Sequence, residues 1–158
     1  MRVEHFQFTQ ASFPGSIAVV RGEPKGVSAD GVTTQIYFRQ SAGVAQAYGE
    51  EFGKAMTYFT GIMGLPARKD LIVVETENGT PNGYASPGVV FLSPRAIGTQ
   101  VNAKLVANEV ARQWWGGLVS PTTRNHMWIE NGLARYSEIL YLEHLNGAAS
   151  LDLAIHDT

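Results

Sequence analysis

Cysteine is absent from the 158 residues of the chain, which excludes disulfide bonds and thiolate metal sites. No apolar run approaches the length of a membrane span, so we expect no transmembrane helix. An excess of positive charge is also lacking: the net charge is −2 and no basic stripe stands out, which argues against a nucleic-acid partner. The 44% of hydrophobic residues are enough for a core, and we predict one domain over residues 1–158.

The period of the apolar residues predicts the elements and their order. Strands are expected over residues 3–8, 17–20, 33–39, 71–75 and 89–92, with a loop or hairpin connection over 22–31 and a long loop over 77–88. Helices are expected over 44–63, 101–115 and 127–145. This order predicts an α+β fold in which a small mixed five-stranded sheet packs on helices, with 71–75 as an interior strand.

One helical segment, residues 106–116, carries the functional argument. Side chains at positions i and i+4 lie on the same helix face, and zinc peptidases use this spacing in the pattern H-E-x-x-H. There the two imidazoles bind zinc, the Glu between them is the general base toward the metal-bound water, and a carboxylate on a following helix is the third ligand. Here Asn108 and Arg112 stand at the i and i+4 positions and flank Glu109.

The flanking residues resemble the membrane alanyl aminopeptidase family, which are zinc aminopeptidases of the gluzincin type. The pattern of that family is close to H-E-x-A-H-Q-W-F-G, followed on a later helix by the liganding Glu within W-L-N-E-G-F-A-x-Y. Residues 128–136 match the second pattern, and eighteen residues separate Arg112 from Asn131, as in the family. The matches to the first pattern are Glu109, Ala111, Gln113, Trp114 and Gly116. The resemblance spans roughly residues 13–145 and implies a thermolysin-like (gluzincin) catalytic-domain core.

The three ligand positions of that family hold residues that bind zinc poorly. Asn108 and Arg112 replace the two His, and Asn131 replaces the Glu. An amide oxygen is a weak neutral ligand, whereas a guanidinium has no free lone pair and stays protonated. The sequence therefore predicts no metal and no cofactor, although the family implies zinc. Glu109, at the general-base position, would then lack a metal-bound water to act on.

A second family signature, G-x-M-E-N, is altered as well. In the family its Glu receives the free amine of the substrate, and the corresponding residues here are Tyr84, Ala85 and Ser86. If Pro87 and Gly88 set the alignment, Ala85 stands in place of that Glu. We expect the strand after Gly88 to be the edge at which an extended peptide pairs with the main chain.

A rearranged site is expected in place of the metal. Arg112 is predicted to replace the charge of the metal and to pair with Glu109 or Glu130, because a buried carboxylate without a partner is costly. Asn108 and Asn131 are predicted to bridge the two helices by amide hydrogen bonds.

The favoured interpretation is a non-catalytic peptidase-like domain with a structural or peptide-binding role, beside other domains of a longer parent protein. One alternative is an active metallopeptidase or other hydrolase with an altered ligand set, in which His126, Glu130 and Glu109 form a rebuilt metal site. Another is a fragment whose function lies in neighbouring domains. The first residues lack the pattern of a signal peptide. The compartment stays open, and export as part of a longer bacterial-type protein is compatible with the sequence.

Overall fold

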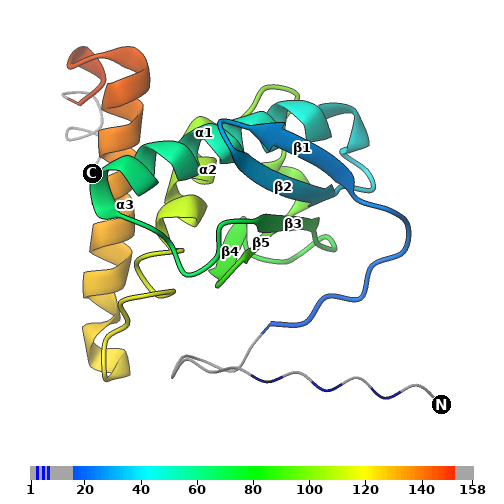
Figure 1. Ribbon diagram of the computed structural model, residues 1–158, viewed down its shortest axis with the longest axis horizontal. Helices are drawn as coiled ribbons and strands as arrows, with labels where there is room; N and C mark the ends of the chain where they lie inside the picture. The colour runs from blue at the N-terminus through cyan, green and yellow to red at the C-terminus, as the bar shows by residue number, and fades with distance from the viewer. Residues whose placement is uncertain (1–2, 4, 6, 8–15, 152–158) are drawn as a thin grey trace.

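The computed structural model describes residues 3, 5, 7 and 16–151. These residues form one five-stranded sheet in the order β1-β2-β3-β5-β4 (Figure 1). Its strands are β1 Lys25–Ala29, β2 Val32–Tyr37, β3 Leu71–Glu75, β4 Gly83–Ser86 and β5 Val89–Leu92. β2, β3 and β5 run parallel, while β1 and β4 run antiparallel to their neighbours at the two edges. The predicted α+β class, the mixed sheet and the interior position of β3 are thus confirmed.

Two tight hairpins form the antiparallel edges. β1 and β2 are joined by Asp30 and Gly31, which both have positive φ (51° and 79°), as a two-residue type I′ turn requires. β4 and β5 are joined by Pro87 and Gly88, and the φ of 77° at Gly88 fits the type II turn that a Pro–Gly pair favours. Each hairpin therefore adds one short strand beside a more apolar neighbour.

Several predicted boundaries are wrong, and the edge strands explain most of them. The predicted loops 22–31 and 77–88 contain β1 and β4, whose Gly, Ser and Ala residues hide the strand pattern. Residues 17–20 are irregular, and of segment 3–8 only residues 3, 5 and 7 lie in the described part, none of them in a strand. The strand after Gly88, β5, is covered by β4, so the edge is β4 and not the predicted strand. Three of the five strands, β2, β3 and β5, therefore lie where strands are predicted, whereas β1 and β4 lie in predicted loops.

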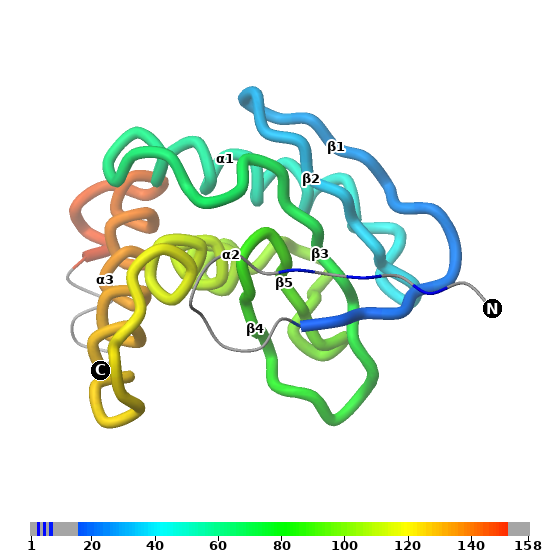
Figure 2. Tube along the Cα trace, turned by 60° about the horizontal axis from the view of Figure 1, so that its bottom comes forward, coloured from blue at the N-terminus to red at the C-terminus, as the bar shows by residue number. Residues whose placement is uncertain are grey.

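The described residues include three α-helices: α1 Ala45–Met63, α2 Ala103–Ala111 and α3 Met127–Asn146. α1 packs on β1 and β2, and α2 contacts α1, α3 and β4. Figures 1 and 2 both show α3 at the end of the molecule away from β1 and β2. α2 is shorter than predicted, because after Ala111 the chain tightens into i→i−3 bonds and turns at Gly116, where φ is 110°. None of these helices is both long and apolar enough for a bilayer span.

The core lies between α1, α2 and the sheet, and it extends to Tyr141 of α3. Tyr48, Phe52, Met56 and Phe59 follow each other at helical spacing and are fully buried or nearly so. Gly49 on the same helix lets β1 approach closely, since a Cβ at Gly49 would lie 2.6 Å from the Cβ of Val27. The small residue is therefore part of the α1–β1 packing.

Substitution of two glycines in α1 tests this packing. Gly49→Ala is expected to lower the free energy of unfolding by about 1–3 kcal/mol, because the new methyl overlaps Val27. Gly61→Ala is the matched control: nothing lies within 4 Å of its Cβ position, so the better helix propensity of Ala is expected to stabilise by up to about 1 kcal/mol. Urea denaturation of both variants measures the difference, and equal effects would contradict the proposed contact.

Candidate functional site

α2 and α3 bring the three residues at the predicted ligand positions into one cluster around the Arg112 guanidinium. Nε of Arg112 donates to Asn108 Oδ1 at 3.2 Å, and Nη1 and Nη2 donate to Asn131 Oδ1 at 3.2 and 3.1 Å. Nη1 also forms an ion pair with Glu130 Oε1 at 3.4 Å. The predicted pairing of Arg112 with Glu130 is therefore confirmed.

A second set of hydrogen bonds extends this cluster along α3. Nδ2 of Asn108 donates to Glu138 Oε2 at 2.9 Å, and Glu138 also forms an ion pair with Arg135. Glu138 is almost fully buried, so these partners satisfy a carboxylate that is removed from water. Asn108 and Asn131 each bond across the two helices, as predicted, and both amide oxygens accept from a fixed positive charge.

Glu109 belongs to the same turn of α2 but faces the sheet. The residue is 5% exposed, and its Oε2 has no hydrogen-bond partner among the described residues. Burial raises the pKa of Glu109 to about 7, and the positive charge of Arg112 opposes this shift only in part. The alternative pairing of Arg112 with Glu109 is not found, because Arg112 extends to α3 while Glu109 contacts β4.

α2 touches β4 at two places. A Cβ at Gly83 would overlap Glu109 Oε1, so glycine at this position lets the carboxylate lie against β4, and a larger residue would displace it. Gln113 holds the β4–β5 turn, since its Nε2 donates to the carbonyl of Ser86 at 3.2 Å and its Oε1 accepts from the amide of Gly88 at 2.7 Å. In the sequence, Gln113 is identified only as a match to the family pattern, and its role in positioning the β4–β5 turn is not predicted.

Tyr84, Ala85 and Ser86, the residues at the predicted amine-binding position, lie on the edge strand β4. The Tyr84 ring is half exposed and lies against Phe91 at a centroid distance of 6.0 Å. The register with β5 and the alternation of an antiparallel ladder direct the main-chain groups of Gly83 and Ala85 away from β5. No strand in the described part of the chain pairs with this outer side of β4. The structure therefore places Glu109 beside an open strand edge.

His126, Glu130 and Glu109 do not come together as a metal site. Nδ1 of His126 hydrogen-bonds with Thr123 Oγ1 at 2.8 Å, Glu130 pairs with Arg112, and Glu109 faces β4. Burial raises the pKa of Glu130, although the charge of Arg112 opposes this. Within residues 16–151 and the three isolated described positions, no group of three His, Asp or Glu side chains is placed to hold a metal ion.

Comparison with known proteins links this site to a peptidase family. Residues 92–157 match the family described as Peptidase family M1 domain. Leucine aminopeptidase 2-1 of Meyerozyma guilliermondii is 33% identical over 73 residues, which cover 46% of this chain and 12% of that protein. A leukotriene A-4 hydrolase homolog of Botryotinia fuckeliana is 33% identical over 73 residues, covering 46% and 11%. Endoplasmic reticulum aminopeptidase 2 of Bos taurus is 44% identical over 39 residues, covering 25% and 4%. The matched part is thus 12% or less of each relative's length.

Glu109→Gln is expected to stabilise the protein at pH 8 and to leave its stability unchanged near pH 4. The folded protein keeps this carboxyl protonated up to about pH 7, whereas the unfolded chain ionises it near 4.5, so stability falls as the pH rises through this window. The gain at pH 8 is at most about 3 kcal/mol.

Urea denaturation at the two pH values measures this effect. Glu50→Gln, on the exposed face of α1, is the matched control, and we expect no pH-dependent difference for it. A gain of the same size in both variants would show that the burial of Glu109 is not the cause.

Proposed function

Because residues 92–157 match the domain of peptidase family M1, we propose that the chain is a peptidase-like domain that binds an extended peptide along β4 without hydrolysing it. The observation that carries this proposal is the Arg112 cluster at the three family ligand positions. The mixed sheet followed by α2 and α3 supports a thermolysin-like core within one domain. The greater length of the relatives supports other domains in a longer parent protein.

Zinc does not fit the Arg112 cluster. Zinc in proteins takes imidazole, thiolate or carboxylate ligands at about 2.0–2.3 Å, whereas the three ligand positions offer two amides and a guanidinium, and the nearby carboxylate of Glu130 is paired with Arg112. The Oδ1 atoms of Asn108 and Asn131 already accept hydrogen bonds from Arg112, whose charge also repels a divalent cation. Without a metal-bound water, Glu109 has no acidified nucleophile to deprotonate, so we assign it a vestigial general-base position.

The open edge of β4 supports the binding of a peptide. The outward main-chain groups of Gly83 and Ala85 match those of an added antiparallel or parallel strand. An unpaired edge is an aggregation hazard that proteins usually cover, and a bound peptide covers it. Tyr84 and Ser86 alternate with these residues, so their side chains flank the proposed peptide. Gln113, just after α2, bonds to Ser86 and Gly88 and thereby fixes the end of the strand.

An active hydrolase is the second candidate, and Glu109 is the observation that favours it. Its pKa of about 7 suits a general acid or base near neutral pH, and it lies next to the proposed peptide strand. Such an enzyme would need a ligand set or a nucleophile other than the family's.

Zinc content and turnover separate the two candidates. Protein that has been incubated with Zn²⁺ and dialysed is expected to contain no stoichiometric zinc by mass spectrometry of the metal. It is also expected to leave leucine p-nitroanilide intact. Stoichiometric zinc together with turnover would establish the enzyme and refute the silent domain.

Substitutions at the ligand positions test whether Asn108, Arg112 and Asn131 are the cause of the expected absence of zinc. Arg112→His alone is expected to stay free of zinc and to lose about 1–3 kcal/mol of stability, because its hydrogen bonds to both amides are lost. The triple variant Asn108→His, Arg112→His, Asn131→Glu is the positive control for zinc binding. Arg39→His is the control for stability: its side chain is 70% exposed, so a loss of about 1 kcal/mol or less is expected. Tight zinc binding by the single variant would contradict the fit argument.

Peptide binding is testable by NMR with the pentapeptide Ala-Val-Ala-Val-Ala. We expect saturable shifts of the β4 amides, while the amides of β1, the opposite edge strand, stay unchanged. Ala85→Pro is expected to abolish these shifts, since proline lacks the outward N–H. Ser28→Pro on β1 is the matched control, because Ser28 also points outward by the register of its hairpin. Equal shifts of the β1 and β4 amides would contradict a peptide site that is specific to β4.

A further inference from the structure

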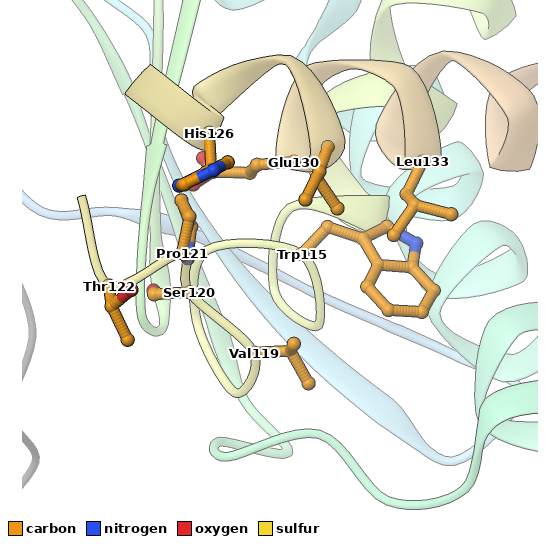
Figure 3. Close-up of a pocket in the computed structure, with 9 residues that line it drawn as sticks. Trp115, Val119, Ser120, Pro121, Thr122, His126, Glu130 and Leu133 are labelled. Carbon is orange, nitrogen blue, oxygen red and sulfur yellow. The ribbon is translucent and has the colours of Figure 1, made fainter. Parts of the chain in front are cut away.

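We propose that the chain holds a second ligand site, which takes a small primary amine with an aromatic or branched aliphatic body. The site is the pocket between the loop after α2 and the first turns of α3 (Figure 3). All of its lining residues lie between Trp115 and Leu133, and none comes from β4. The inference therefore goes beyond peptide binding and does not rest on it.

The pocket has the size and the surface of a small-molecule site. Its volume is about 420 Å³, within the range of about 300–1,000 Å³ that ligand sites span. Figure 3 shows Trp115, Val119 and Leu133 on one side and the loop residues Ser120 to Thr122 on the other. Ile129 adds a further apolar group from α3. These side chains form an apolar surface against which the apolar body of a ligand can pack.

Hydrogen bonds fix these walls before any ligand binds. Nε1 of Trp115 donates to Ser137 Oγ at 2.9 Å, which holds the indole against α3. The amide of Gly116 donates to the carbonyl of Val119 at 2.8 Å, and Ser120 Oγ donates to the carbonyl of Gly116 at 2.8 Å. A preformed pocket of this kind loses little entropy when it binds a ligand.

The charged groups of the pocket favour a cation. Glu130 lines it and its side chain is 12% exposed, while no lining residue is Lys or Arg. Oε1 of Glu130 is used by Arg112, whereas no donor in the described part of the chain bonds to Oε2. A ligand ammonium supplies such a donor, and hydrogen bonds between ionised groups are the stronger kind. Arg112 balances the formal charge of Glu130, so the preference for an ammonium rests on the charge-assisted hydrogen bond to Oε2.

Gly116 makes this placement of Glu130 sterically feasible. It has a φ of 110°, and a Cβ at this residue would lie 2.7 Å from Glu130 Oε1. The turn that ends α2 therefore leaves room for the carboxylate at the wall of the pocket. His126, the other titratable lining residue, is held at Nδ1 by a hydrogen bond with Thr123 Oγ1 at 2.8 Å.

The test compares three probes of one shape by NMR at pH 8: 2-phenylethylamine, 2-phenylethanol and 3-phenylpropanoate. We expect the amine to shift the indole N–H signal of Trp115 in a saturable way and to bind about tenfold or more tightly than the alcohol or the anion. The indole of Trp114, which bonds to the carbonyl of Gly64, is the internal reference.

Two variants test the two parts of the site separately. Glu130→Gln is expected to remove the preference for the amine over the alcohol, and Leu133→Trp, which fills the pocket, is expected to remove the binding of both. Glu143→Gln on the same helix is the matched control and should bind the amine as the wild type does. Near-native amide spectra confirm that the variants fold.

Three results would overturn the inference. One is the absence of a saturable Trp115 shift, and another is equal affinity for the amine and the alcohol in the wild type. The third is a shift of Trp115 by Ala-Val-Ala-Val-Ala at the concentration that shifts the β4 amides, which would make the pocket part of the peptide groove. Failure of the peptide to bind β4, by contrast, concerns only the proposed function.

Discussion

Arg112, directly after α2, donates hydrogen bonds to Asn108 of α2 and to Asn131 of α3, and the bonds to Asn131 connect the two helices at the positions that hold ligands in the zinc-peptidase pattern. The positive charge at this place is the guanidinium of Arg112, whose N–H groups can donate to amide oxygens as well as to carboxylates. The rest of the site depends on this connection. It aligns Glu130 with the loop after α2, and it leaves α2 in the position from which Gln113 holds the β4–β5 turn.

Glu109 is the buried carboxyl group on the side of α2 that faces the sheet. In the family pattern this residue acts on a metal-bound water, but here no residue that the structure describes bonds to its Oε2, and it lies against Gly83 of β4. A neutral carboxylic acid is the form that burial favours, and it can both donate and accept a hydrogen bond. This acid therefore lies directly against the edge strand β4. The proposed peptide strand would therefore lie next to this acid.

The sequence predicts the elements whose apolar period is long and regular. α1, α3 and β3 are found within a residue or two of their predicted bounds, because their buried faces impose the pattern. β1 and β4 escape prediction, since an edge strand of Gly, Ser and Ala carries no such pattern. The Arg112–Glu130 pair follows from charge and spacing, whereas the direction of Glu109 and the pocket beside Trp115 depend on helix packing and on the turn at Gly116.

Anomalous diffraction at the zinc edge, from crystals grown with added Zn²⁺, tests the central claim most directly. The account predicts no anomalous peak between the side chains of Asn108, Arg112 and Asn131, with the guanidinium still bonded to both amides. A strong peak at that position, with Arg112 turned away, would contradict it.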